Sequence, residues 1–193
     1  AAAVRDHADD PPALDLALEE THYRTLHALA LRLPAKDRIP LLPLLRLHLD
    51  LRTTVKALRL HKSYARTPAA AVAGLFFHDP VEEPRLAAAL PAADPLQAFP
   101  PACRKGVRGI LAAQHFSGDD EPQEQHSLHC LERAAALYLH RTFVKGFYRA
   151  HRSLAPLFCF YFLLKREIPN TARLTNCIRF EVPPHTFRQE LTS

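Results

Sequence analysis

Leucines recur mostly at intervals of three or four residues near the start of the chain. Charged side chains occupy the other faces between Leu14, Leu18, Leu26, Leu29 and Leu33. This spacing predicts an amphipathic helix over residues 13–33. The helix follows Asp10-Pro11-Pro12, in which an acidic N-cap precedes prolines that are tolerated in a first turn.

Comparable patterns predict that the rest of the chain is also helical, with prolines and polar breaks between the helices. The stretch from Thr67 to Gln114 holds many of the 17 prolines and therefore favours short helices. After a polar break at residues 117–122, a long apolar pattern begins again. Seven predicted helices cover residues 39–49, 50–64, 68–77, 81–90, 102–114, 124–150 and 154–164. A separate helical run follows 154–164 and ends near residue 178, and a last short helix covers 183–191.

The order of these helices repeats along the chain. Leu18-Glu19 lies 113 positions before Leu131-Glu132. Asp50-Leu51 lies 117 positions before Glu167-Ile168. In each case a long helix is followed by a strongly apolar one, an acidic junction and a further helix, so we expect an internal repeat. We divide the chain into a first helical unit (1–66), short connecting helices of that unit (67–120) and a second, C-terminal helical unit (121–193).

The composition fits a folded helical protein. Only 5 glycines accompany the 17 prolines, which disfavours glycine-rich phosphate loops and tight hairpin turns. The longest apolar run, residues 157–164, is far shorter than the roughly 20 residues of a membrane-spanning helix. The four cysteines lack paired spacing, so we expect reduced thiols in a cytoplasmic protein. The chain begins Ala1-Ala2-Ala3 and contains no Met, which favours a processed start or a fragment.

Two groups of residues have the spacing of metal ligands but lack the remaining ligands. His126, His129 and Cys130 fall on one helical face, yet no second pair with matching spacing follows. Glu19 and His22 resemble half of a di-iron motif, which needs a second Glu-x-x-His and further carboxylates. No nucleophile has a supporting base in the sequence. We therefore predict no metal site and no cofactor.

The net charge of +5 permits an anionic partner. One basic and aromatic cluster raises the hypothesis of nucleic-acid binding. However, the sequence has no recognised nucleic-acid motif, and helix faces rich in Lys and Arg are usually solvated, so we expect no nucleic-acid partner. Anionic lipid headgroups are a second hypothesis for the charge surplus. The cluster consists of Phe147 and Tyr148 with Lys145, Arg149, Arg152, Lys165 and Arg166.

Three segments, in the same order, resemble one protein family over nearly the whole chain. Residues 160–170 begin with an aromatic and aliphatic run, continue with the basic pair Lys165-Arg166 and end with Glu167-Ile168-Pro169-Asn170. Residues 49–59 contain Asp50-Leu51-Arg52 and end on an arginine, and residues 183–191 correspond to a closing helix. The chain thereby resembles the family formed by the C subunit of bacterial and archaeal V/A-type ATP synthases and the d subunit of the eukaryotic vacuolar proton pump (V-ATPase). Family members carry three such helical units, so we expect that the first is missing here.

The resemblance implies an all-α, funnel-like architecture with pseudo-threefold symmetry. It also implies a non-catalytic central-stalk protein on the cytoplasmic face of the membrane, which couples the central shaft to the proteolipid ring during ion transport. The shaft subunits and the ring are the partners that it implies. Asp50, Glu167 and Asn170 are expected either to cap helix N-termini or to contact a partner, and Arg52 and Arg59 belong to the same candidate set. The alternative is an unrelated all-helical protein–protein interaction scaffold, although solenoid units repeat every 20 to 50 or so residues, a shorter interval than the one found here.

Overall fold

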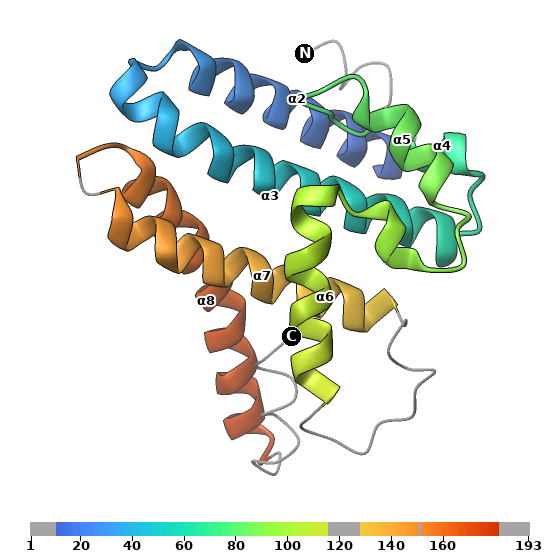
Figure 1. Cartoon of the computed structure of the whole chain (residues 1–193). Coiled ribbons are helices and arrows are strands. Elements are labelled where there is room, and N and C mark those ends of the chain that lie inside the picture. Colours follow the sequence, from blue (N-terminus) through green and yellow to red (C-terminus); the bar gives the residue numbers. More distant parts are fainter. Residues whose placement is uncertain (1–10, 116–127, 151, 182–193) are drawn as a thin grey trace.

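The computed structural model describes residues 11–115, 128–150 and 152–181 (Figure 1). Every regular element in these ranges is a helix, which confirms the predicted all-α class. The N-cap at Asp10, the start of the helix predicted at 124–150 and the helix predicted at 183–191 lie outside the described residues. The elements are α2 (Pro11–Arg32), α3 (Ala35–Lys62), α4 (Pro68–Val72), α5 (Glu82–Ala89), the 3-10 helix η1 (Pro95–Ala98), α6 (Pro101–His115), α7 (Leu128–Arg149) and α8 (Ala155–Arg179).

Helices α2 and α3 form a long hairpin across the upper part of Figure 1. Helix α2 confirms the helix predicted at 13–33. Helix α3 begins at Ala35, earlier than predicted, and continues through Pro40 and Pro43. Pro40 and Pro43 lie in the second and third turns, and each removes one backbone hydrogen bond. The buried side chains of Leu41 and Leu45 hold this part of the helix against its neighbours.

The helix break predicted at Asp50 is wrong, because α3 runs without interruption from Ala35 to Lys62. The flanking side chains of Leu49 and Leu51 are both buried. An aspartate inside a helix costs roughly 0.7 kcal/mol relative to alanine. Burying one leucine side chain contributes about 1.5–3 kcal/mol, so the apolar pattern carries the helix through the acidic residue.

The short helices α4, α5, η1 and α6 connect α3 to α7, as the many prolines of this region predict. Helix α4 ends at Val72 rather than near residue 77, because Ala73 is non-helical and Gly74 adopts a φ of 76°. A positive φ of this size favours glycine. Thr67 and Asp94 accept hydrogen bonds from amides in the first turns of α4 and η1, which fixes where these two helices begin.

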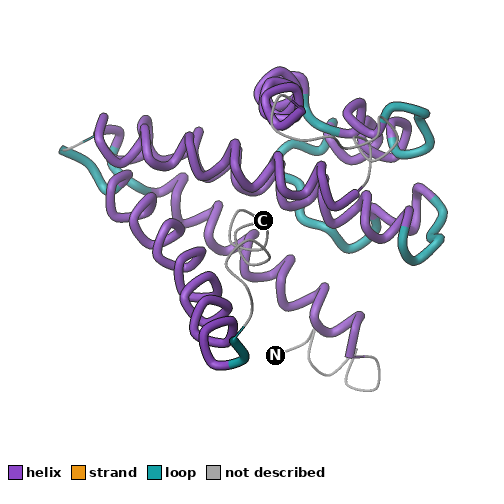
Figure 2. The backbone as a smooth tube through the Cα atoms, turned by 90° about the horizontal axis from the view of Figure 1, so that it is seen from below, coloured by secondary structure: helices purple, strands orange, loops and turns teal. Residues whose placement is uncertain are grey.

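Helices α7 and α8 form a second hairpin, whose two arms diverge from their common turn (Figures 1 and 2). The prediction of two separate helices between residues 154 and 178 is wrong, because α8 is continuous from Ala155 to Arg179. The charged step Lys165-Arg166-Glu167 consists of good helix formers and therefore does not interrupt the helix. Glu167 and Asn170 consequently lie inside α8.

Two buried clusters hold the helices together. The larger surrounds Phe99 and combines α3, the short helices and α7. The smaller surrounds Leu45 and combines α2, the first half of α3 and the start of α8. Both clusters contain residues from more than one predicted unit, so the units share their cores. The division of the chain at 66/67 and 120/121, and the repeat itself, stay predictions.

Two local contacts determine how the hairpins and α6 meet. Asp37, buried in the first turn of α3, accepts a 2.9 Å hydrogen bond from the Leu154 amide at the start of α8. This bond joins the turns of both hairpins at one end of the molecule (Figure 1). Helix α6 crosses α7 at Gly106, where a Cβ atom would overlap the ring of Tyr138. The crossing therefore needs a glycine.

Candidate functional site

The second half of α3 carries a row of basic side chains that contacts two other helices. Arg52, Lys56 and Arg59 follow one another at intervals of four and three residues, so they share one face. Glu19 on α2 accepts hydrogen bonds from Arg52 Nε (2.5 Å) and from Lys56. Glu132 on α7 accepts two from Arg59, at 3.0 and 2.8 Å. We call these five residues the α3 brace, because they tie α2 and α7 to α3.

The electrostatics of the brace keep Glu19 and Arg59 charged. Burial alone raises the pKa of Glu19, but hydrogen bonds and charges from Lys56 and Arg52 outweigh burial and hold the pKa below its ordinary value. The hydrogen bond to Glu132 raises the pKa of Arg59 against the opposing effect of burial. Glu19 and Arg59 are therefore ionised at neutral pH. Because the pairs are partly exposed, each contributes about 1 kcal/mol or less to stability.

A groove of about 580 Å³ lies along the brace, between the start of α2 and the end of α3. Its titratable lining residues from α2 are Asp15 and Glu19, and four basic side chains line the opposite side. The paired charges give the groove the character of a polar contact surface. The residues that line it are Asp15, Leu16, Glu19, Arg52, Val55, Lys56, Arg59, Leu60, Tyr64 and Arg66.

A buried aromatic cluster lies behind the brace. The Arg52 guanidinium is 5.6 Å from the centre of the Tyr23 ring, and Tyr23 packs edge-on against His48 at 6.1 Å. The His48 ring centre lies 4.3 Å from that of Phe162 on α8, and neither nitrogen of His48 has a hydrogen-bond partner in the described part of the chain. Burial raises the pKa of Tyr23 to about 12 and lowers the pKa of His48 to about 3. Both rings are therefore neutral at pH 7 and act as packing groups.

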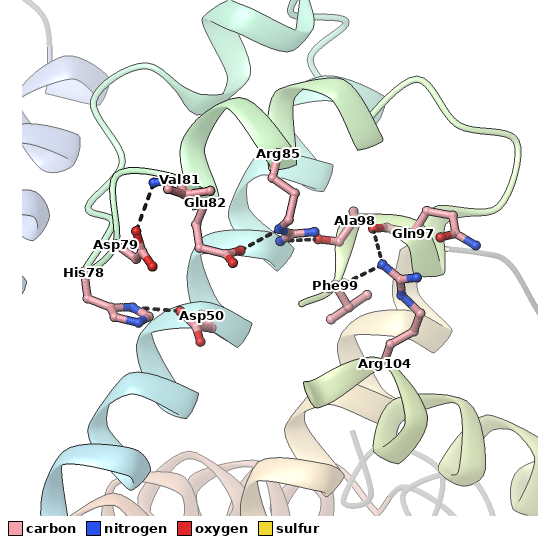
Figure 3. Close-up of polar contacts among 10 residues, drawn as sticks. All are labelled: Asp50, His78, Asp79, Val81, Glu82, Arg85, Gln97, Ala98, Phe99 and Arg104. Carbon is pink, nitrogen blue, oxygen red and sulfur yellow. Dashed lines mark hydrogen bonds and ion pairs between the residues drawn. The ribbon is translucent and has the colours of Figure 1, made fainter. Parts of the chain in front are cut away.

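Asp50 faces His78 in the segment between α4 and α5 (Figure 3). Its Oδ1 atom lies 3.0 Å from Nδ1 of His78. Next to this pair, Glu82 accepts a 2.6 Å hydrogen bond from Arg85 Nε, and Arg85 also donates to the Ala98 carbonyl at 3.2 Å. The Asp50–His78 pair thus holds the segment between α4 and α5 on α3, and Arg85 links α5 to η1.

The residues at the start of α6 complete this polar cluster. Arg104 donates hydrogen bonds to the carbonyls of Gln97 (3.1 Å) and Phe99 (3.2 Å), as Figure 3 shows. The adjacent Cys103 thiol is buried, and burial, reinforced by the nearby carboxylates, raises its pKa to about 12. A thiol with this pKa is protonated and a poor nucleophile at neutral pH.

The candidate metal ligands do not come together in the ranges that the structure describes. There, no group of three His, Cys, Asp or Glu side chains could hold a metal ion. His129 and Cys130 lie on α7, and His126 lies outside the described residues. Glu19 is occupied by the basic side chains of α3, while His22 is exposed.

The five predicted site residues lie in two separate places. Asp50, Arg52 and Arg59 belong to the second half of α3, and each has a partner within the chain. Glu167 is exposed and Asn170 half-buried on α8. The expectation that Asp50, Glu167 and Asn170 cap helix N-termini is wrong, because all three lie inside continuous helices. That these residues contact a partner protein stays a prediction.

Helix α8 exposes a row of large apolar side chains opposite the face that it packs against the other helices. Ala155 and Cys159 are fully buried on the packed face. The outward residues recur at intervals of three, one, three and four, which places them within about 100° of the helix surface. We call them the α8 stripe: Leu157, Phe160, Tyr161, Leu164 and Ile168, each 47% to 65% exposed. No described helix has the length and apolar character needed to cross a membrane.

Sequence reasoning finds the candidate arginines but misses both their partners and the direction of the stripe. Glu19 and Glu132 occupy corresponding positions of the two predicted units, yet nothing local in the sequence indicates that they meet α3. Residues 157–164 are apolar on every side of the helix, so periodicity cannot separate the packed face from the outward one. Comparison of the chain with protein-family models, curated proteins and solved structures finds no match.

Proposed function

We propose that this chain is a non-catalytic central-stalk component of a V/A-type rotary ATPase, which couples the central shaft to the membrane proteolipid ring during ion transport. In this proposal it works on the cytoplasmic side of the membrane and needs no cofactor. The resemblance of residues 49–59 and 160–170 to that family of stalk proteins supports it. The all-helical architecture agrees with the proposal, although the funnel and its pseudo-threefold symmetry remain part of the proposal.

The observation that carries the proposal is the α8 stripe. A helix that is apolar all around is normally buried on all sides. In this chain the outward face of α8 is exposed at Leu157, Phe160 and Ile168. Burying a large apolar side chain contributes about 1.5–3 kcal/mol, so covering five of them provides substantial binding energy for a partner. We propose that the partner is the helical foot of the central shaft.

The α3 brace supports the mechanical part of the proposal. An adaptor that transmits torque needs helices that keep their relative positions under load. Glu19 and Glu132 tie α2 and α7 to the same helix, and Asp37 ties the start of α3 to the start of α8. Helices α2, α7 and α8 are thereby each linked to α3 by a polar contact as well as by the buried clusters.

A pull-down tests the proposal. Purified shaft subunits of a V/A-type ATPase serve as the first bait and the detergent-solubilised proteolipid ring as the second. We expect the chain to be retained by the shaft at moderate salt and Leu164→Asp to be released, because a charge in the middle of the stripe cannot be buried unpaired. Val81→Asp is the matched control, since Val81 is 69% exposed but lies far from α8 in the sequence and outside the stripe.

Failure of both baits to retain a folded, helical chain contradicts the proposal. The alternative, an unrelated all-helical protein–protein interaction scaffold, would then be favoured, because the α8 stripe would suit another helical partner equally well. Retention that Leu164→Asp does not weaken would support the ATPase assignment but contradict the role given to the stripe.

A further inference from the structure

The turns of the two long hairpins meet at one end of the molecule (Figure 1). The hydrogen bond between the Leu154 amide and Asp37 links them directly, at 2.9 Å. We call this region the double-turn end and define it as residues 31–40, 149–150 and 152–154. In Figure 1 it lies at the opposite end of the molecule from α4 and α5, and it does not include the α8 stripe.

The double-turn end is basic. A shallow hollow of about 510 Å³ is lined there by Lys36, Pro40, Arg149, Ala150, Arg152 and Ser153. Every titratable side chain of this lining is positively charged. In the described ranges none of these three side chains forms an ion pair, whereas the carboxylate of the neighbouring Asp37 is buried and hydrogen-bonded. The hollow therefore offers three cations to an anionic partner.

Aliphatic side chains surround these charges. Ile39 is 70% exposed and follows Lys36 by three positions on α3, so the two share one helix face. Leu31 and Leu154 are 43% and 42% exposed at the adjoining turn positions. Exposed aliphatic residues among lysines and arginines are typical of surfaces that lie in the interface of a lipid bilayer.

We propose that the double-turn end docks on the surface of an anionic lipid bilayer. Lys36, Arg149 and Arg152 contact headgroup phosphates, and Ile39 and Leu154 enter the boundary between headgroups and acyl chains. A membrane fits better than a nucleic acid, because the exposed side chains of Ile39, Leu31 and Leu154 around the cations are aliphatic and offer bases no ring to stack on. The exposed ring of Tyr148 next to Arg149 also suits a bilayer interface. The inference goes beyond the proposed function and does not depend on it, since it uses a different surface.

The charges set the expected size of the effect. One lysine or arginine close to an anionic membrane strengthens binding by about fivefold at physiological ionic strength. Removing all three should therefore weaken binding by about a hundredfold. The attraction falls off within a Debye length of about 10 Å at 0.1 M salt, so binding should also weaken as salt is raised.

Co-sedimentation of the whole chain with lipid vesicles tests the charges. We expect the chain to pellet with vesicles of phosphatidylcholine and phosphatidylserine and to remain in solution with phosphatidylcholine alone. The variant in which Lys36, Arg149 and Arg152 are replaced by glutamine should bind the anionic vesicles about a hundredfold more weakly. The matched control replaces three other exposed basic residues by glutamine and should retain most of it. These control residues are Lys62 on α3 with Lys105 and Arg108 on α6.

A second pair of variants tests the apolar contact. Ile39→Ser should weaken binding to the anionic vesicles by roughly tenfold, because a serine side chain gains nothing from entering the acyl boundary. Val81→Ser, at a residue of similar exposure (69%) outside the double-turn end, should have no effect. Far-UV circular dichroism checks that all variants remain helical.

Three results would overturn the proposal. The first is equal pelleting with neutral and anionic vesicles, and the second is unchanged binding by the triple glutamine variant. The third is binding to duplex DNA that the triple variant loses while its vesicle binding stays intact, which would assign the hollow to nucleic acid. Loss of vesicle binding in both Ile39→Ser and the triple variant, with retention in both controls, supports the proposal.

Discussion

Replacing His48 with leucine should make the stability of the protein less sensitive to acid. The His48 ring is 7% exposed and packs against Phe143 and Phe162. Burial, with the positive charges of Arg52 and Lys165, lowers the pKa of His48 to about 3. An unfolded histidine has a pKa of about 6.5 and binds a proton below that pH, whereas the folded chain does not. The stability that depends on the neutral ring is therefore present above about pH 6.5 and is lost as the pH falls toward 3.

The size of this effect follows from the two pKa values. In the window between them, each pH unit removes up to about 1.4 kcal/mol from the free energy of unfolding. Integrated from pH 7 to pH 5, the His48 ring accounts for a loss of about 2 kcal/mol. Leucine has a similar volume and no titrating group, so this part of the pH dependence should disappear in His48→Leu.

Urea unfolding, followed by far-UV circular dichroism at pH 7 and pH 5, measures the difference between the two proteins. Burial also lowers the pKa of His27 and of His140, but both residues are present in wild type and variant, so they cancel. His22→Leu, at an exposed position on α2, is the control and should keep the wild-type pH dependence. If wild type and His48→Leu lose the same stability between the two pH values, the argument that the ring is buried and neutral is refuted.

Three further predictions concern the contacts between helices, and all are measured by urea unfolding. Alanine replacements of Arg59 and Glu132 should show a coupling energy of about 0.5–1 kcal/mol in a double-mutant cycle, because the pair is doubly hydrogen-bonded but partly exposed. Gly106→Ala should lower the free energy of unfolding by about 1–3 kcal/mol, since its Cβ would overlap a ring on α7. Gly109→Ala, with open space around its Cβ, should raise it by up to about 1 kcal/mol. Asp37→Ala should cost about 1–3 kcal/mol, because the Leu154 amide loses its acceptor, and Asp37→Asn should retain most of that stability.

Each of these predictions has a distinct contrary result. Strictly additive effects of the two alanine replacements would mean that the ion pair contributes nothing in solution. Similar destabilisation by Gly106→Ala and Gly109→Ala would contradict the close crossing of α6 and α7. If asparagine at position 37 is as damaging as alanine, the hydrogen bond to the start of α8 is not what stabilises the protein there.

The positions of the helices could be predicted from the sequence because apolar spacing is a local property. The leucines around Leu18 and Leu26 are sufficient for α2. The breaks between helices are harder to predict from the sequence. An acidic residue does not end a helix where the apolar residues on both sides of it are buried. At Asp50 they are buried, and the tertiary packing of Leu49 and Leu51 overrides the local signal.

The candidate site is predictable only in part for a similar reason. Arg52 and Arg59 can be selected from the sequence, but their partners Glu19 and Glu132 are 33 and 73 positions away. Those pairs exist because α2 and α7 both pack along α3, and helix packing depends on the shapes of many side chains at once. The outward direction of the α8 stripe likewise depends on how α8 packs against its neighbours, which the local sequence does not determine.

The buried contacts of α8 lie close to its beginning. After Cys159 no described side chain of this helix is buried, and its C-terminal half points away from α2 and α3 (Figure 1). Arg166 donates a 2.8 Å hydrogen bond to the Ala136 carbonyl of α7 near the middle of α8. A helix of 25 residues is about 37 Å long, so a tilt of about 5° at its start displaces its far end by about 3 Å. The direction of the far half of α8 therefore depends on two hydrogen bonds, the Leu154–Asp37 bond at its start and the Arg166–Ala136 bond near its middle.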